Sequence, residues 1–380
     1  MQTVSYLVFT LSIFAGLAYS AQLLYFYYGF KKGKAYKPTI NTPKTTVSII
    51  VAARNEESTI TTCIHSLLAQ NYPSHLMEII VVDDDSTDAT LSQLELLRIG
   101  NPIKLIRLNP TSEKGKKAAI AKAINQATHE LIVTTDADCQ VSPYWITTLV
   151  NHYENEFNTM LLGPVAFYGE KNLFEKIQSL EFMALLGITA GSANLGKPLL
   201  CNGANLAYTK SAFIRFNGFE SHTSIASGDD MLLLQKIRNQ QTTTIAFVMS
   251  NAAMVTTTAQ ASLKKFMAQR KRWFTKSLVA SDKQANTVAF LVFLMCSLIF
   301  INTVVGLVWK NNYFFYYAFA LFSLKSLLDF IFLYSVARFF QKTKLLVYFP
   351  LAQLFIIVYT ISMAFVSITK TYNWKGREVR

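Results

Sequence analysis

The stretch Leu131–Cys139 constrains the fold more than any other part of the chain. It begins with apolar and β-branched residues and ends in two carboxylates one residue apart, Asp136 and Asp138. Such a run predicts a short buried strand, and alternate residues of a strand point to the same side. Both carboxylates are therefore expected at the strand's carboxyl end, where open α/β sheets bind ligands. Paired oxygen ligands suit a divalent cation, although an ordinary turn is the alternative.

Strands and helices are predicted to alternate on the N-terminal side of this stretch. The pattern predicts strands at Val47–Ala52, Glu78–Val82, Ile103–Leu108 and Leu131–Thr135, and helices at Glu56–Gln70, Thr87–Arg98 and Lys116–Ala127. Strands separated by helices predict a mostly parallel, Rossmann-like sheet with helices on both faces. We expect this α/β domain to occupy residues 38–280, after a polar linker.

Both ends of the chain are apolar. Residues 1–30 carry no charged side chain and are followed by Lys31-Lys32-Gly33-Lys34, which predicts an N-terminal anchor over residues 1–37. A cleaved signal peptide is the alternative, but no basic residue precedes the apolar run. Further spans are predicted at 285–309, 313–335 and 345–369, within a C-terminal region 281–380. Lys325 and Asp329 in the second of these are expected to neutralise each other, or alternatively to line a polar path.

The basic residues indicate a cytoplasmic membrane face. The net charge is +13, yet the chain has no Arg-rich arm or zinc-finger spacing, so nucleic acid is not an expected partner. The first anchor predicts an external N-terminus and a cytoplasmic α/β domain. Four spans would then place the C-terminus outside, whereas the positive-inside tendency would keep its basic tail inside. Either one span is re-entrant or the tail is an exception, and both alternatives remain open.

Two polar turns follow predicted strands. Ser48–Glu57 runs from a strand into a helix start without the Gly-x-Gly-x-x-Gly of a dinucleotide-binding fold, so its side chains could hydrogen-bond a base and ribose. Ile79–Asp88 places a row of acids after a buried strand. Asp83, nearest the strand, is the candidate to contact a nucleoside, while Ser86 or Asp88 fits a helix cap. Helix capping is the alternative interpretation of the first turn.

Three later segments carry charged or polar groups. Lys114–Lys117 opens a helix without the full pattern of a phosphate loop, yet Lys116 could bind a diphosphate at the helix N-terminus. Ser227–Asp230 precedes a helix, and a carboxylate there can act as a general base. In Gln269–Trp273, Arg272 suits a leaving phosphate and Trp273 a sugar ring. The alternative is a basic amphipathic helix at the membrane surface.

These motifs, in this order, resemble those of the membrane-bound family 2 glycosyltransferases. The matching segments are Val82-Asp83-Asp84, Asp136-Ala137-Asp138, Gly228-Asp229-Asp230 and Gln269-Arg270-Lys271-Arg272-Trp273. The family includes cellulose, chitin and hyaluronan synthases, poly-N-acetylglucosamine synthase and ceramide glucosyltransferase, and its last motif is Gln-(Gln/Arg)-x-Arg-Trp. The resemblance covers residues 44–280 and implies a GT-A fold, a nucleotide-sugar donor, usually a UDP-sugar, and inversion at the anomeric carbon.

The resemblance also implies a role for each matching residue. Asp230 is the expected catalytic base, with Asp229 where many members have Glu. Asp138 and Asp136 are expected to bind Mg²⁺ or Mn²⁺. The donor-binding set is Ala53, Asn55, Glu56, Asp83, Asp84, Lys116, Asp136, Gln269, Arg270 and Arg272, and the acceptor-binding set is Trp273, Gly203 and Asn205. One departure is Asp85, where relatives commonly have Gly, which concerns the backbone of the turn more than the chemistry.

The expected function is inverting transfer of a sugar from a nucleotide-sugar, usually a UDP-sugar, to a lipid or membrane-associated saccharide acceptor. The expected location is the bacterial inner membrane, with the catalytic domain in the cytoplasm and membrane lipids as partners. A processive polysaccharide synthase is the first alternative, although three C-terminal spans are few for a polymer channel. A non-catalytic, nucleotide-sugar-binding assembly protein is the second, although every expected acid is present. The sugar, the acceptor and the oligomeric state stay open.

Overall fold

The computed structural model describes residues 2–36, 43–109, 115–219, 229–279, 282–366, 372–374 and 377–379. The chain divides into two compact units. Unit 1 contains residues 1–32, 170–192 and 260–370, and unit 2 contains residues 33–169, 193–259 and 371–380. Two segments inside the predicted 38–280 domain, 170–192 and 260–280, therefore group with the apolar ends of the chain.

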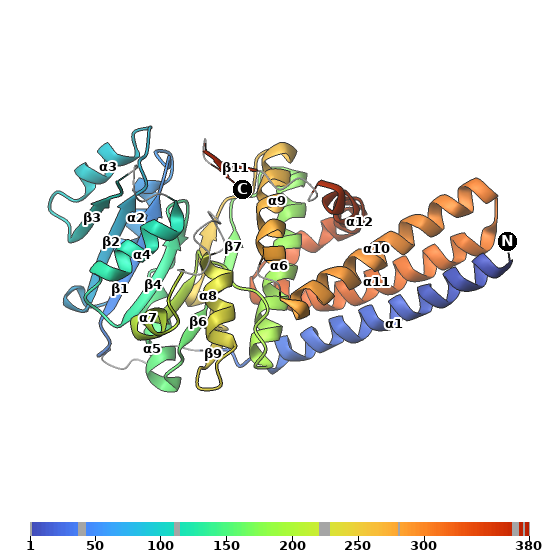
Figure 1. The fold of residues 1–380 in the computed structure, drawn as a ribbon, viewed down its shortest axis with the longest axis horizontal. Helices are drawn as coiled ribbons and strands as arrows, with labels where there is room; N and C mark the ends of the chain where they lie inside the picture. Colours follow the sequence, from blue (N-terminus) through green and yellow to red (C-terminus); the bar gives the residue numbers. More distant parts are fainter. Residues whose placement is uncertain are drawn as a thin grey trace. The chain divides into compact units, whose positions relative to one another are not determined.

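Unit 2 is built around a mixed sheet. Among the described residues this sheet has seven strands in the order β3-β2-β1-β4-β8-β6-β9 (Figure 1). The strands are β1 (Val47–Ala53), β2 (Met77–Asp83), β3 (Ile103–Arg107), β4 (Leu131–Asp136), β6 (Met160–Leu162), β8 (Leu206–Thr209) and β9 (Ile245–Phe247). The predicted strands all form, and β3, β2, β1 and β4 run parallel. Strand β8 runs antiparallel to both of its neighbours.

The predicted helices of the parallel part also form, with shorter ends. They are α2 (Ile60–Leu68), α3 (Thr90–Leu97) and α4 (Lys116–Gln126). Helix α2 begins later than predicted because the backbone N–H groups of Thr59 and Ile60 both donate to the Glu56 carbonyl, which makes a turn. Helix α4 packs on β1 and β2. The strand order reverses after β1, so right-handed crossovers put α4 on the opposite face from α2 and α3.

The register of the parallel strands positions the acidic residues. Ala53 at the end of β1 lies opposite Asp83 of β2, and Ala52 lies opposite Asp136 of β4. Strands in a sheet are about 4.8 Å apart, so the two acids flank β1 at a spacing of roughly 10 Å. The order of the strands reverses between β1 and β4, and ligands of open α/β sheets bind at such a point.

Unit 2 also contains a second, small sheet. Among the described residues it contains three strands in the order β5-β10-β7. The remaining elements of unit 2 are β5 (Gln140–Val141), α5 (Trp145–Glu156), β7 (Val165–Phe167), α7 (Lys210–Arg215), α8 (Asp229–Arg238), β10 (Val255–Thr257), β11 (Tyr372–Trp374), β12 (Arg377–Val379) and the short 3₁₀ helices η1 (Ser74–Leu76) and η3 (Asn251–Ala253). Strands β11 and β12 pair as an antiparallel hairpin.

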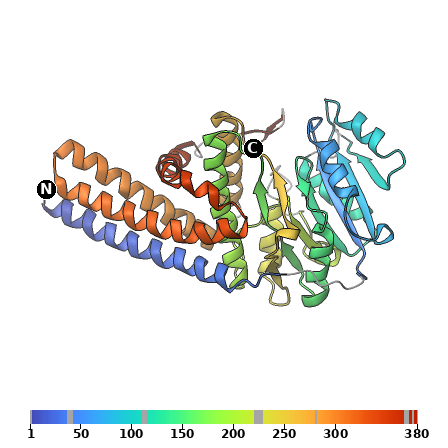
Figure 2. The same ribbon diagram turned by 180° about the vertical axis from the view of Figure 1, so that it is seen from behind.

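Unit 1 is helical. Its elements are α1 (Gln2–Lys32), α6 (Leu173–Asn194), α9 (Leu263–Val279), α10 (Lys283–Trp309), α11 (Asn312–Phe339), η4 (Thr343–Tyr348) and α12 (Phe349–Val366). Within the described residues, four helical segments are long and apolar enough to cross a membrane: Ser5–Lys32, Lys283–Trp309, Asn312–Phe339 and Thr343–Ala364. Helices α1, α10 and α11 run side by side along their length (Figures 1 and 2). The predicted apolar helices are therefore present.

A buried polar network links α1, α11 and α12. The Lys325 ammonium lies 2.5 Å from Asp329 Oδ2 and donates to Gln353 Oε1 at 3.0 Å. Gln353 Nε2 donates to Asp329 Oδ2 at 2.8 Å, and the Tyr19 hydroxyl donates to Asp329 Oδ1. Lys325 and Gln353 are almost completely buried. This arrangement confirms the predicted self-neutralising pair and adds partners from two other helices.

Helix α6 makes close backbone contact with the membrane-type helices. A Cβ atom added at Gly191 would lie 2.3 Å from the Phe26 carbonyl oxygen of α1. A Cβ atom at Gly187 would lie 2.6 Å from Val336 of α11. The two glycines are four residues apart on one face of α6, a spacing that lets helices approach closely. This packing explains why α6 belongs to unit 1.

We expect Gly191→Ala to lower the unfolding temperature of unit 1 in detergent. The added methyl meets a backbone oxygen that cannot move aside, and such overpacking costs about 1–3 kcal/mol. Gly16→Ala is the matched control, because its Cβ would meet only the ends of two side chains, Leu324 at 3.3 Å and Leu321 at 3.5 Å. Equal unfolding temperatures for the two variants would contradict the close contact.

Candidate functional site

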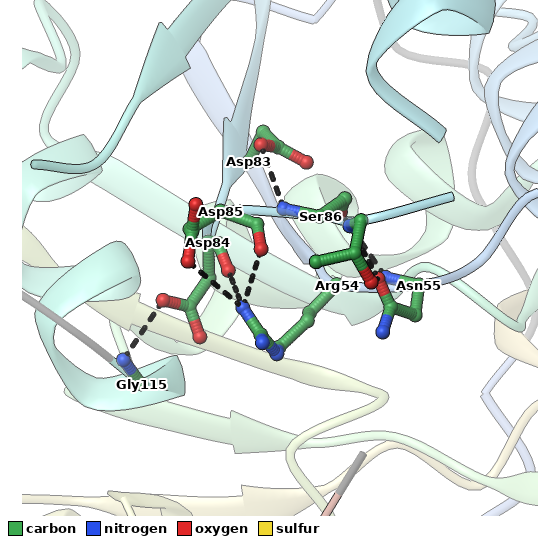
Figure 3. A network of polar contacts seen from close by, with 8 residues as sticks. Arg54, Asn55, Asp83, Asp84, Asp85, Ser86 and Gly115 are labelled. Atoms are coloured by element: carbon green, nitrogen blue, oxygen red, sulfur yellow. Dashed lines mark hydrogen bonds and ion pairs between the residues drawn. The ribbon is translucent and has the colours of Figure 1, made fainter. Parts of the chain in front are cut away.

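The turns after β1 and β2 are joined by an arginine (Figure 3). Arg54 Nη1 donates to the carbonyl oxygens of Asp84 and Asp85, the latter at 2.6 Å. The same nitrogen lies 3.7 Å from Asp85 Oδ2. Arg54 is buried, and the carbonyls that it contacts belong to the turn that follows Asp83. Its guanidinium therefore fixes the path of the acidic turn. No role was predicted for Arg54 from the sequence. The available signal was a basic residue directly after one strand, β1, with an acidic turn after the neighbouring strand, β2.

Both turns contain a residue in the left-handed backbone region. Asn55 has φ 51° and Asp85 has φ 55°. Asn55 Oδ1 accepts from the Thr87 backbone N–H at 2.9 Å, and the Asn55 N–H donates to Ser86 Oγ at 3.1 Å. Asn and Asp tolerate this region better than other residues with a Cβ. The value at Asp85 explains why a glycine suits this position in relatives.

Asp83 and Asp84 point to different partners. Asp84 Oδ1 accepts from the Gly115 N–H at 3.0 Å, which connects this turn to the start of α4. Asp83 Oδ2 accepts from the Ser86 N–H at 3.2 Å. Asp83 is buried, and within the described part of the chain its Oδ1 has no hydrogen-bond donor. A buried acceptor without a partner is costly, so this oxygen marks a place where a ligand donor fits.

The other residues of these turns that were predicted to bind the nucleotide-sugar, Ala53 and Glu56, contact the surrounding protein. The Ala53 carbonyl accepts from the Asp84 N–H at 2.8 Å. The Glu56 N–H donates to Thr90 Oγ1 at 2.7 Å, and its carboxylate accepts from Thr59 at 3.2 Å. Asp88 accepts from the Thr90 N–H at 3.0 Å, although the N-cap position of α3 is Ala89 and not the predicted Ser86 or Asp88. Burial raises the pKa of Asp88, but the hydrogen bonds from Thr90 outweigh burial and lower it overall.

Three separate motifs meet at the end of β4. The Lys116 ammonium of α4 lies 2.5 Å from Asp136 Oδ1. The Gly203 N–H donates to Asp230 Oδ2 at 3.0 Å. A Cβ atom at Gly203 would lie 3.3 Å from Lys116 Nζ and 3.5 Å from Asp230 Oδ2, so the ammonium and the second carboxylate are neighbours. Lys116, Asp136, Gly203 and Asp230 therefore share one location in unit 2, as the sequence predicted.

Thr134 also contacts Gly203 at this location, and no role was predicted for it from the sequence. Its hydroxyl donates to the Gly203 carbonyl at 3.1 Å, while the N–H of the same glycine donates to Asp230. The threonine is buried in β4, two residues before Asp136 on the same side of the strand. A polar residue among the apolar residues of a central strand was the available signal.

The two carboxylates at the end of β4 differ in their surroundings. Asp136 is half-buried and paired with Lys116, whereas Asp138 is exposed. The described residues contain no group of three or more His, Cys, Asp or Glu side chains arranged to hold a metal. Two carboxylates fit a hard cation that takes its other ligands from a diphosphate. The residues thus suit a cation that binds together with a phosphate-bearing ligand.

Two cysteines lie next to this strand end. Cys63 and Cys139 are buried beside this strand end. Burial, and after it the nearby Asp138 carboxylate, raises the pKa of both thiols well above the usual value. This agrees with their predicted role as packing residues.

Asn205 does not occupy the predicted acceptor-binding position. Its side chain is fully buried, and its amide Oδ1 accepts from the Trp145 indole N–H at 2.9 Å. Its Nδ2 donates to the carbonyls of Pro164 and Ala253, both at 2.8 Å. These contacts use the donors and the acceptor of the amide, so Asn205 joins four segments of unit 2. The sequence around Asn205 does not indicate these contacts, because the partner residues are distant in the chain.

Arg270 likewise has a structural environment in place of the predicted donor contact. Within unit 1, its Nε donates to Glu181 Oε1 of α6 at 3.2 Å, and Nη2 pairs with the other oxygen of the same carboxylate. The guanidinium carbon lies 4.7 Å from the Phe266 ring centroid and 4.1 Å from that of Trp273. Arg270 is buried, and its fork binds one carboxylate between two aromatic rings.

The other residues of this motif remain candidates on α9. Gln269 Oε1 accepts from Arg270 Nη1 at 3.0 Å. Arg272 Nε is buried and has no hydrogen-bond partner among the described residues of the chain. One face of Trp273 is covered by Arg270, and its ring centroid lies 5.9 Å from that of Phe182. These residues belong to unit 1, and their approach to the carboxylates of unit 2 stays a prediction.

Parts of two motifs lie outside the described residues. These are Lys114 and Ser227-Gly228. Asp229 is the first residue of α8, and Asp230 follows it on the same helix. The role predicted for Asp229 stays a prediction.

The sequence is similar to that of known glycosyltransferases. Residues 48–220 match the family model described as glycosyl transferase family 2. A beta-monoglucosyldiacylglycerol synthase from Nostoc sp. is 31% identical over 128 residues, which cover 33% of this chain and 27% of that protein. A poly-beta-1,6-N-acetyl-D-glucosamine synthase from Staphylococcus aureus is 25% identical over 221 residues, which cover 56% of this chain and 52% of that protein. The chain thus spans about half or less of these relatives.

A solved structure shares the fold. The mannosyltransferase PcManGT from Pyrobaculum calidifontis, solved in complex with GDP-Man and Mn²⁺, superposes with a TM-score of 0.60. The two chains are 17% identical, and the match covers 95% of this chain and 99% of the other. This likeness concerns the fold, which is GT-A with added apolar helices, as the sequence predicted.

We expect Asp85→Gly to leave the free energy of unfolding nearly unchanged and Asp85→Val to lower it. Glycine adopts the left-handed conformation without strain, whereas a β-branched residue there costs about 1–2 kcal/mol. Chemical denaturation followed by circular dichroism measures both variants. A valine variant as stable as the glycine variant would contradict the conformation assigned to this turn.

We expect Glu181→Gln to destabilise unit 1 by about 3–5 kcal/mol, because it leaves the Arg270 guanidinium buried without a counter-charge. The double variant Glu181→Gln/Arg270→Gln removes both charges and should recover part of this loss. Thermal unfolding in detergent measures the set. A double variant less stable than the single one would show that the ion pair does not determine the packing of α9 on α6.

Proposed function

We propose that the chain transfers a sugar, with inversion, from a nucleotide-sugar donor to an acceptor held at a membrane, a proposal supported by the match of residues 48–220 to the family model described as glycosyl transferase family 2. The observation that carries this proposal is the convergence of three motifs at the end of β4. Lys116, Asp136 and Asp230 come from distant parts of the sequence and surround Gly203. Such a group of charged side chains at a strand-order reversal suits a diphosphate and an activated hydroxyl.

The turns after β1 and β2 would hold the nucleoside. Asp83 Oδ1 is buried and lacks a donor among the described residues, and the N–H of a base or a ribose hydroxyl would supply one. Arg54 and Asn55 fix the backbone around it through Asp85 and Thr87. A preformed turn of this kind lowers the ordering cost of binding. The family resemblance favours a uridine nucleotide, which the donor screen below tests.

A divalent cation, Mg²⁺ or Mn²⁺, would be held by Asp138 and Asp136, which fit it as a pair completed by phosphate oxygens. When bound, the cation neutralises charge on the departing diphosphate. Lys116 lies 2.5 Å from Asp136 and contributes a second positive charge at the same place. The exposed Asp138 is the side chain that a cation arriving with the donor would reach first.

Asp230 would act as the base that removes the acceptor's proton. The Gly203 N–H binds its Oδ2 and leaves its orientation fixed by the backbone. Its Oδ1 accepts from the N–H of Met231 at 2.8 Å, at the start of α8. Because the glycine has no Cβ, an acceptor hydroxyl can approach beside Lys116. The proton passes to the Asp230 carboxylate as the hydroxyl attacks the anomeric carbon.

The apolar helices support an acceptor held at the membrane. Four described helical segments are long and apolar enough to cross a bilayer, and two basic residues, Lys31 and Lys32, form part of the last turn of α1. We place the chain in a bacterial inner membrane with unit 2 in the cytoplasm, where positive residues favour the inner side. One relative's name refers to a glucosyl lipid and another to a polysaccharide. The second name makes a processive synthase the alternative, and product length on a gel separates the two.

We expect Asp230→Asn to lower kcat by about 100- to 10,000-fold, because general base catalysis supplies this factor. Donor binding should stay unchanged, since the nucleoside contacts lie at other strand ends. The purified protein in detergent is screened against UDP- and GDP-sugars with Mn²⁺ or Mg²⁺, and nucleotide affinity is measured by calorimetry. Glu95→Gln on the exposed face of α3 is the control.

Two results would contradict these assignments separately. A wild-type protein that binds nucleotide but transfers or hydrolyses no nucleotide-sugar would contradict the proposed enzyme activity. An Asp230→Asn variant with the wild-type rate would contradict the role of Asp230 as base and leave the activity itself intact.

A further inference from the structure

The C-terminal hairpin shows how often the chain crosses the membrane. Residues 371–380 group with residues 33–169 and 193–259 in unit 2, and the pair β11–β12 lies in this last segment. A compact water-exposed unit lies on one side of a membrane. The chain leaves unit 2 before residue 260 and returns to it after residue 370. It must therefore cross the membrane an even number of times in between.

Three apolar helices lie in that interval, so one of them does not cross. Helices α10 and α11 are connected by a short turn at Lys310 and run side by side with α1. Helix α12 is oriented differently: it is seen nearly end-on in both views, in which α1, α10 and α11 lie lengthwise (Figures 1 and 2). Because α12 is steeply inclined to the other three helices, α12 is the helix that does not span the membrane.

We propose that α12 lies in the plane of the membrane, within the leaflet at the end of α11 that leads to η4, and that its outer face contacts lipid acyl chains. The chain then has three spans, α1, α10 and α11. This topology puts the basic C-terminal tail on the same side as Lys31 and Lys32, which removes the conflict with the positive-inside tendency. The inference goes beyond the proposed function and is independent of it.

The two faces of α12 fit this location. Leu351, Leu354 and Val358 are 48%, 56% and 61% exposed and lie on one face of the helix, at spacings of three and four residues. On the other side, Gln353 and Ala352 are almost completely buried. An exposed apolar face requires lipid, whereas the opposite face is packed against protein.

The contacts of the buried face place α12 in one half of the bilayer. Gln353 binds Lys325 and Asp329 of α11. Asp329 is ten residues from the end of α11 at Phe339, which corresponds to about 15 Å along the helix. Helix α11 has 28 residues and is therefore about 42 Å long, which exceeds the roughly 30 Å hydrocarbon core. Gln353 therefore lies in the leaflet at the end of α11 that leads to η4.

Further contacts join α12 to α9, whose exposed side is basic. The Phe355 and Tyr359 rings lie 5.9 Å and 5.2 Å from that of Phe266, measured between centroids. Lys264 and Lys265 near the start of α9 are exposed. A helix with exposed lysines and a buried phenylalanine is typical of a membrane surface. Helix α12 packs on its apolar side, which fits a position just below that surface.

Two measurements on the full chain test the proposal. First, cysteines are introduced at Gln341, in the turn after α11, and after Arg380, and each is labelled with an impermeant maleimide in intact and lysed cells. The unsubstituted chain measures labelling of the native cysteines. Labelling of both sites from the same side is expected, whereas labelling from opposite sides would overturn the proposal, because α12 would then cross.

Second, spin labels at Leu351 and Val358 report their depths in nanodiscs of phosphatidylethanolamine and phosphatidylglycerol. Both side chains are exposed, so the substitutions leave the packed face intact. In a spanning helix these residues differ in depth by about 10 Å, because seven residues rise by 1.5 Å each. An in-plane helix gives equal depths, which is the expected result. A difference near 10 Å would overturn the proposal, whatever the chain's enzymatic activity.

Discussion

The register of three parallel strands determines the arrangement of unit 2. Because backbone pairing fixes Ala53, Asp83 and Asp136, the acids of two motifs flank β1 whatever rotamers their side chains adopt. A register shift of one residue in β2 or in β4 would turn the acid of that strand to the other face of the sheet. Contacts made by the residues beyond the strand ends then fix the positions of the neighbouring turns and side chains. Arg54 fixes the acidic turn, and Gly203 fixes the Asp230 carboxylate.

Unit 1 depends on a different kind of contact. In a membrane, close approach of helices requires small residues, and polar groups require partners within the protein. Gly187 and Gly191 provide the approach of α6 to α11 and α1, while Glu181 and Arg270 join α6 to α9. Helix α6 thus connects the apolar helices to the helix that carries Arg272 and Trp273. The motif residues on α9 are oriented by buried contacts of their own unit.

The sequence predicts local features better than distant contacts. Hydrophobic periodicity and composition were sufficient to predict β1 to β4, the apolar helices and the pairing of Lys325 with Asp329, because each of these features depends on residues close together in the chain. The convergence of Lys116, Asp136 and Asp230 was predicted through the strand ends and the family motifs. The environments of Asn205 and Arg270 were not predicted, since their partners Trp145, Pro164 and Glu181 lie tens of residues away. A polar side chain looks the same in a sequence whether it is buried or binds a ligand.

Asn202 and Gly203 form an Asn-Gly pair, the dipeptide in which the glycine nitrogen most readily attacks the asparagine side chain to form a succinimide. In the folded protein that nitrogen donates its hydrogen to Asp230, and Asn202 Oδ1 accepts from the Ala204 N–H at 3.0 Å. Both reacting groups are thereby kept from their ring-closing geometry. The folded backbone is thereby protected from succinimide formation at Gly203, the residue that orients Asp230, and a chain that unfolds, even briefly, loses that protection.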